Sequence, residues 1–170
     1  MIKPDNGRSQ SALVKGILLT QLEVKTPMHG TFLQLISPLN LSKLVEKLKK
    51  SEDPKRKYEY ILWLGKKLKE PDNEIFVEEY KVKGCVSEVF VKANIKGGKL
   101  FWEGYCDALI TKGLLAFLIS GLNELTPNEV VNIDKKFIED TGLRSSLTPS
   151  RSNGFLNILL KMQSQANEFL

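Results

Sequence analysis

The side chains best suited to chemistry in this 170-residue chain are its two cysteines, Cys85 and Cys106. A thiolate can act as a nucleophile, as a metal ligand and as a partner in thiol–disulfide exchange. The two cysteines are twenty-one positions apart, which fits neither a zinc-binding pattern nor a C-x-x-C redox pair. The single histidine, His29, is far from both in the sequence, so no Cys/His catalytic pair is evident.

Cys85 lies in the stretch VKGCVSEVF, residues 82–90, where a predicted strand begins. The preceding Gly84 permits backbone angles that other residues avoid, which predicts a turn or a sheet edge at the thiol. Lys81 and Lys83 would favour the thiolate if they faced it, whereas the neighbouring valines would bury the thiol. These residues alone leave three interpretations open: a buried packing cysteine, a nucleophilic thiol, or a cysteine without a special role.

Two helices are predicted before this segment from apolar spacing and capping residues. Residues 40–50 form an amphipathic helix with Asn40 as its N-cap. Residues 51–70 form a second helix that begins with Asp53 as the cap and a proline at the first helical position. Its buried stripe is expected to consist of Tyr58, Ile61, Leu62 and Leu68. Residues 75–84 are expected to be a loop.

A β-hairpin is predicted next. Residues 87–93 alternate in polarity and are rich in β-branched side chains, which indicates a strand. The two glycines of KGGK, residues 96–99, favour a tight turn, and residues 100–106 supply the partner strand.

Helices are predicted again from residue 107 onward. Residues 107–122 are apolar on nearly every side, which predicts a buried central helix capped by Asp107. TPNE, residues 126–129, is a capping box, and a short helix within residues 135–143 should end at Gly142. A last helix starts near Thr148 or Ser150, with an inner face made of Phe155, Ile158, Leu159, Met162 and Ala166. The chain is therefore predicted to be an α+β protein with a small antiparallel sheet packed against helices.

Composition and charge limit the classes of partner. The net charge is +5, and residues 41–70 alone carry ten basic and five acidic residues. This surplus lies on two predicted helices without interleaved aromatic residues. We therefore interpret the basic segment first as a solvated helical face, second as a docking face for an acidic protein, and third as a nucleic-acid site. No apolar run is long enough to span a membrane, and residues 11–24 do not make a convincing signal peptide. Residues 1–40 are expected to be a loosely ordered extension, residues 41–170 the domain, and the location cytoplasmic, with a plastid as the alternative.

Three stretches together resemble the SufE family of sulfur-acceptor proteins. They are VKGCVSEVFV, GYCDALITKGL and LTPSRSNGFL, and the resemblance runs from about Leu41 to Ala166. The last stretch is similar to the cyanobacterial and plastid branch of the family. The resemblance implies a SufE/IscU-like fold.

The resemblance also implies a function. A cysteine desulfurase of the SufS type, which uses pyridoxal phosphate, would pass its persulfide sulfur to Cys85 and be stimulated in doing so. The sulfur would then go to an iron–sulfur scaffold. The chain would be an accessory carrier and activator rather than a turnover enzyme, with no cofactor or metal of its own.

The resemblance assigns supporting residues to the site as well. Gly84 and Ser87 would be flexible neighbours of Cys85, and the loop is expected to switch between inward and outward positions. Asp107 would cap the buried helix or position the cysteine loop. Arg151 would bind a carboxylate of the partner or Asp107 itself. Cys106 is a departure, because serine is expected there, and we interpret it as a tolerated small residue.

Other functions remain as alternatives. An iron–sulfur scaffold usually needs about four ligands, mostly thiolates, and two cysteines with a distant His29 do not supply them. A thiol-dependent hydrolase is disfavoured by the lack of a Cys/His pair. The remaining alternative is a protein-interaction module without chemistry.

Overall fold

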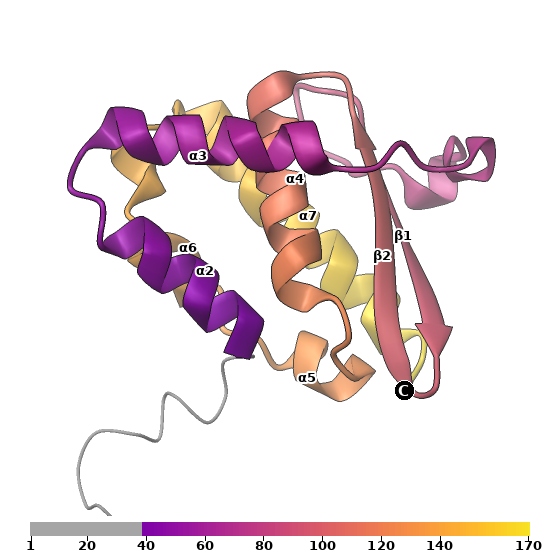
Figure 1. The fold of residues 1–170 in the computed structure, drawn as a ribbon. Helices are drawn as coiled ribbons and strands as arrows, with labels where there is room; N and C mark the ends of the chain where they lie inside the picture. Colours follow the sequence, from indigo (N-terminus) through magenta and orange to yellow (C-terminus); the bar gives the residue numbers. More distant parts are fainter. Residues whose placement is uncertain (1–38) are drawn as a thin grey trace, which may run out of the picture. The chain divides into compact units, whose positions relative to one another are not determined.

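The computed structural model describes residues 39–170 of the chain. Figure 1 shows this part, in which the central helix α4 (Leu109–Leu122) lies between two helices on one side and a β-hairpin on the other. The expected extension and His29 lie outside the described residues. The α+β class with a small antiparallel sheet is confirmed.

The first two helices are α2 (Leu39–Lys49) and α3 (Pro54–Lys67). Asp53 caps α3 as predicted, because its carboxylate accepts a hydrogen bond from the backbone N–H of Lys55 at 2.9 Å. The prediction that Asn40 caps the first helix is wrong. That helix begins one residue earlier, so Asn40 is already within its first turn, which brings Leu41 into the core. Of the predicted stripe on α3, Ile61 is fully buried and Tyr58, Leu62 and Leu68 are partly buried, while Leu64 completes the buried face.

The segment after α3 contains two short 3-10 turns, η1 (Asn73–Ile75) and η2 (Glu78–Tyr80), where a loop was expected. The hairpin follows, with β1 (Val89–Lys96) and β2 (Lys99–Cys106) paired antiparallel from Val89 opposite Cys106 to Lys96 opposite Lys99. The first strand therefore lies two to three residues later than predicted. The residues that precede it are used by the cysteine loop, and the glycine turn extends the pairing to Lys96.

Both outer edges of this hairpin are occupied by groups from outside the sheet. On β1, the buried Gln165 accepts from the N–H of Ala93 and donates to the carbonyl of Val91, both at 2.8 Å. On β2, the side-chain oxygen of Asn123 accepts from the N–H of Trp102 at 2.9 Å. Leu100 also exchanges backbone hydrogen bonds with the segment that follows α4. These polar groups of the strands are thus satisfied by helix α7 (Pro149–Asn167) and by the turn after α4.

Helix α4 is apolar on nearly all sides because α2, α3, β2 and α7 all pack against it. Its contact with α3 is unusually close at Gly113, where a β-carbon would overlap the backbone of Ile61. The prediction that Asp107 caps this helix is wrong. Ala108 occupies the N-cap position, and the Asp107 carboxylate instead accepts from the backbone N–H of Glu88 at 3.0 Å.

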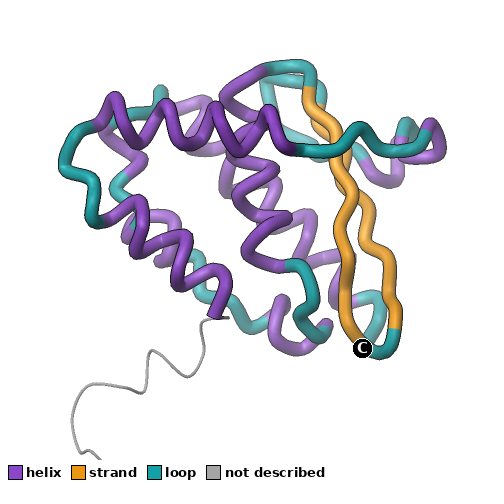
Figure 2. The backbone as a smooth tube through the Cα atoms, viewed as in Figure 1, coloured by secondary structure: helices purple, strands orange, loops and turns teal. Residues whose placement is uncertain are grey.

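The remaining helices are α5 (Pro127–Val131), α6 (Lys136–Asp140) and α7 (Pro149–Asn167), with a 3-10 turn, η3 (Leu143–Ser145), between the last two. The capping box at Thr126 and Glu129 is confirmed, as is Gly142 at the end of α6, where the backbone φ is 65°. All five residues predicted for the inner face of α7 are buried. Figure 2 shows the result as a mainly helical body with its strands confined to one side. No helix within residues 39–170 is long and apolar enough to cross a bilayer.

Candidate functional site

Cys85 lies in a loop with a rigid base. The backbone N–H of the buried Val82 donates to the carbonyl of Val89, also buried, at 2.8 Å, and an isolated bridge pairs Lys81 with Phe90. These contacts close off residues 83–88, which we call the cysteine loop. The base of the loop therefore belongs to the core.

The Cys85 thiol is half-buried at the mouth of a pocket of about 260 Å³. It donates a weak hydrogen bond to the backbone carbonyl of Gly154, with a sulfur–oxygen distance of 3.7 Å. Three elements line the pocket: the cysteine loop, the start of α4 through Ala108 and Thr111, and the start of α7, which contributes Thr148, Ser150, Arg151 and Gly154. The pocket therefore combines a thiol, hydroxyl groups and one guanidinium group.

Burial raises the pKa of the Cys85 thiol above its ordinary value. Removing the thiol from water disfavours its charged form, so the thiol is mainly protonated in this position near neutral pH. The ammonium group of Lys81 pairs with Glu88 at 3.7 Å, and burial is the cause of the shift at Cys85. The loop in this position shelters a thiol and does not activate it.

The structure brings all the predicted site residues to this loop. Gly84 has a φ of 75°, which glycine adopts freely, and Ser87 lies 3.4 Å from the hydroxyl of Thr111 on α4. Asp107 holds the end of the loop, because it exchanges two hydrogen bonds with Glu88. Arg151 lines the same pocket and is exposed, and it forms no ion pair with Asp107 or any other acid within residues 39–170.

Cys106 is a packing residue, in line with our interpretation of it. It is only 3% exposed, and its thiol donates to the carbonyl of Ala108 at 3.5 Å. Burial raises its pKa to about 11, and the nearby negative charges of Asp107 and ionised Cys85 contribute in the same direction. Both cysteines are free thiols.

Sequence reasoning missed two contributions from α7. Asn157 donates through its amide to the carbonyl of Gly84 at 3.1 Å, and Gly154 accepts from Cys85. Residues three apart share one face of a helix, so a predicted α7 with Gly154 at the site would also have indicated Asn157. In the part of the chain that the structure describes, no three His, Cys, Asp or Glu side chains gather into a metal site.

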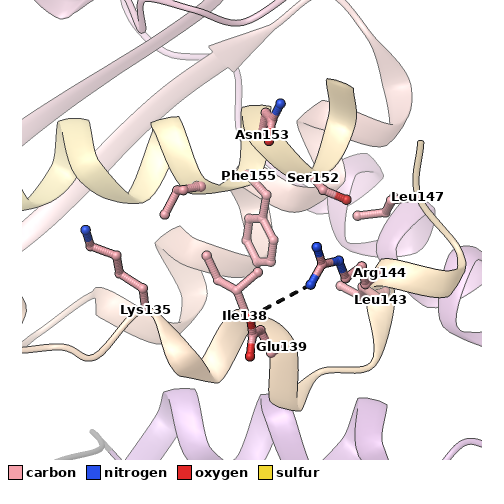
Figure 3. A pocket seen from close by; sticks show the side chains of 10 residues that line it. Lys135, Ile138, Glu139, Leu143, Arg144, Leu147, Ser152, Asn153 and Phe155 are labelled. Carbon is pink, nitrogen blue, oxygen red and sulfur yellow. Dashed lines mark ion pairs between the residues drawn. The ribbon is translucent and has the colours of Figure 1, made fainter. Parts of the chain in front are cut away.

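A second pocket, of about 220 Å³, lies between α6, η3 and the start of α7 (Figure 3). Its walls are mainly apolar and include Ile138, Leu143 and Phe155. An ion pair between Arg144 and Glu139, with a nitrogen–oxygen distance of 3.9 Å, stands at its rim. No thiol lines this pocket, whereas Cys85 lines the pocket described above.

Comparison with known proteins identifies the family. A family model described as SufE, Fe-S metabolism associated domain, matches residues 42–166. An uncharacterised SufE-like protein from Synechocystis is 50% identical over 132 residues, which make up 78% of this chain and 83% of that protein. The cysteine desulfuration protein SufE of Plasmodium vivax is 37% identical over 116 residues, 66% of this chain and 46% of the relative, so the match spans less than half of that protein.

The solution structure of a hypothetical protein from Thermus thermophilus has the same fold, with a TM-score of 0.69 and 26% identity, over 78% of this chain and 96% of the other. The chain belongs to the SufE family, which is associated with iron–sulfur metabolism. The resemblance to the SufE family is thus confirmed, and the 50% identity to the Synechocystis protein agrees with the expected similarity to the cyanobacterial branch.

Proposed function

We propose that this chain accepts sulfur on Cys85 from a cysteine desulfurase that uses pyridoxal phosphate, stimulates that enzyme, and passes the sulfur on to an iron–sulfur scaffold in the cytoplasm. The observation that carries the proposal is a half-buried thiol on a loop whose base is fixed and whose tip faces a pocket. Names of relatives that refer to cysteine desulfuration support it. It makes the chain an accessory carrier and not an enzyme that turns over.

The transfer is a thiol–disulfide type of exchange. The Cys85 thiolate attacks the outer sulfur of the partner's persulfide, and a new sulfur–sulfur bond forms on Cys85. The bond within the partner's persulfide breaks, and its cysteine leaves as a thiolate with the electron pair. The proton on the outer sulfur stays with it, so atoms and charge balance.

The raised pKa implies that this attack begins from a different position of the loop. A sheltered thiol is a poor nucleophile, since the thiolate is the reactive form. Moving outward would return the sulfur to water or to the partner's site and lower the pKa of the thiol towards its ordinary value, which increases the thiolate fraction. The pocket then shelters the persulfide once the loop moves back.

Exposed apolar side chains flank the site and offer a docking surface for the desulfurase. Val86, next to the thiol, is 90% exposed, and Leu109 at the start of α4 is 73% exposed. Arg151 is available nearby for a carboxylate of the partner. Exposed apolar residues beside a reactive group are typical of a protein-binding surface.

The proposal is tested by incubating the protein with a cysteine desulfurase, free cysteine and a reductant. With the reductant present, wild-type protein should increase sulfide release; with the reductant left out, its Cys85 peptide should gain the mass of one sulfur atom. Cys85→Ser should lose both effects while it still folds and binds the enzyme. Cys106→Ser is the matched control and should retain both. If Cys106→Ser loses transfer and Cys85→Ser keeps it, the site assignment is wrong; binding without any mass gain would indicate an interaction module.

A further inference from the structure

We propose that Asn157 is a positioning residue that holds the cysteine loop in its inward position and thereby sets how often Cys85 becomes exposed. This inference rests on the proposed function, because it concerns the movement of the sulfur acceptor. It assigns a role to a side chain of α7 that lies outside the cysteine motif.

The geometry places one face of α7 against two adjacent residues in the first half of the loop, Gly84 and Cys85. Asn157 donates to the Gly84 carbonyl at 3.1 Å, and one turn earlier the Gly154 carbonyl accepts from the Cys85 thiol at 3.7 Å. A β-carbon added at Gly84 would lie only 2.8 Å from the Asn157 amide nitrogen. The glycine thus lets the helix approach the loop closely enough for this hydrogen bond.

The other contacts of the loop have different consequences. The Val82–Val89 hydrogen bond fixes the base, and the Asp107–Glu88 pair fixes the end that leads into β1. Asn157 acts on the opposite end, beside Gly84, where the backbone has the greatest freedom to rotate. Breaking its bond therefore releases the thiol and leaves the base in place.

The Asn157–Gly84 hydrogen bond is strong enough to favour the inward position and weak enough to break when the loop opens. A thiol-to-carbonyl bond is weak, so the amide bond from Asn157 is the stronger of the two that α7 makes to the loop. A neutral hydrogen bond of this kind contributes about 1 kcal/mol, which corresponds to roughly a fivefold change in an equilibrium. Such a bond keeps the loop inward most of the time and still yields to a partner.

The test measures the rate at which iodoacetamide alkylates Cys85 in the full chain, followed by peptide mass. Asn157→Ala should raise the rate about fivefold, in proportion to the exposed population. Asn157→Leu, which has a similar size and no donor, should do the same. Asn153→Ala and Asn153→Leu are matched controls, since Asn153 is exposed one turn earlier on the same helix; both should match wild type.

The pH profile of alkylation separates positioning from general loosening of the fold. A released thiol is less buried, so the midpoint of its profile should move down towards the ordinary cysteine value in both Asn157 variants. These variants leave the ionisable groups of the loop and of the elements packed against it unchanged: Arg151 on α7, Cys106 on β2, Asp107 directly after β2, and Lys83 and Glu88 in the loop; α4 contributes only Ala108 and Thr111 to the pocket.

Equal rates and equal midpoints in wild type and both Asn157 variants would overturn the proposal. So would Asn157→Leu behaving as wild type while Asn157→Ala reacts faster, because that result would assign the effect to side-chain size. The assay needs no desulfurase. If the Asn157 variants are alkylated faster but the protein gains no sulfur from a desulfurase, the role of Asn157 stands and the proposed function is rejected. If the protein gains sulfur but the Asn157 variants are alkylated at the wild-type rate, the proposed function stands and the role of Asn157 is rejected.

Discussion

Replacing Gly84 by alanine perturbs the inward loop at a position where both the backbone conformation and the contact with Asn157 require a glycine. The residue has a φ of 75°, where a β-carbon costs about 1–2 kcal/mol. That carbon would also lie 2.8 Å from the Asn157 amide nitrogen, so the amide must turn away and lose its bond to the Gly84 carbonyl, at about 1 kcal/mol. An outward loop avoids both penalties. The inward position should therefore lose about 2 kcal/mol relative to the outward one, even after a modest entropic offset.

A change of about 2 kcal/mol corresponds to roughly a 30-fold larger exposed population. The assay is again alkylation of Cys85 at mildly alkaline pH, under conditions where the rate follows the exposed fraction. Gly84→Ala should react roughly 30-fold faster than wild type by this estimate. Its far-UV circular dichroism should be unchanged because the base of the loop stays in the core.

Gly98 provides the matched control. Its φ is also 75°, but it lies in the hairpin turn with no atom within 4 Å of an added β-carbon. Gly98→Ala should lower the free energy of unfolding by about 1 kcal/mol from the same backbone strain and leave the Cys85 rate as in wild type. If Gly84→Ala loses stability to the same extent and its Cys85 rate does not rise, the loop does not open locally and the reasoning is refuted.

Four further predictions concern the thiols and the core. The alkylation rates of both thiols should rise with pH, and that of Cys106, whose pKa is about 11, should still rise where that of Cys85 has levelled off; peptide mapping measures both. Because the folded state holds these protons more tightly than the unfolded chain, stability should also fall as the pH rises past the ordinary thiol pKa, and Cys106→Ser should reduce that fall. Gln165→Leu leaves an N–H and a C=O of β1 unpaired, so its free energy of unfolding in urea should drop by about 3 kcal/mol, and no drop would show that water replaces the side chain. Gly113→Ala forces α3 away from α4, since the main chain that it meets cannot rotate aside; a loss of about 3 kcal/mol should appear as a lower Tm, and an unchanged Tm would contradict the close contact.

Local patterns in the sequence predicted the elements well. The inner face of α7, the capping box at Thr126 and the glycine turn of the hairpin are all present. Each depends on residues within a few positions of one another, so spacing and backbone preference are sufficient to predict them.

Several of the differences arose where a side chain contacts a residue outside its own predicted element. Asp107 was expected to cap the helix that follows it, yet its carboxylate is used by Glu88 in the cysteine loop. Lys81 was a candidate activator of the thiol and instead pairs with that same glutamate. Asn157 attracted no notice because its partner, Gly84, is seventy-three positions away. Such contacts depend on how the elements pack, which periodicity does not determine.

The occupied edges of the hairpin restrict how this protein can meet another. A bare strand edge invites a strand from a neighbouring chain, which gives both recognition by strand addition and aggregation. Here Gln165 forms hydrogen bonds with backbone groups of Val91 and Ala93 on β1. Asn123 and the turn after α4 do the same with Trp102 and Leu100 on β2. A visiting protein would have to displace these side chains to extend the sheet. Association is thereby directed to side-chain surfaces, such as the rim around Cys85 that we propose as the site of sulfur transfer.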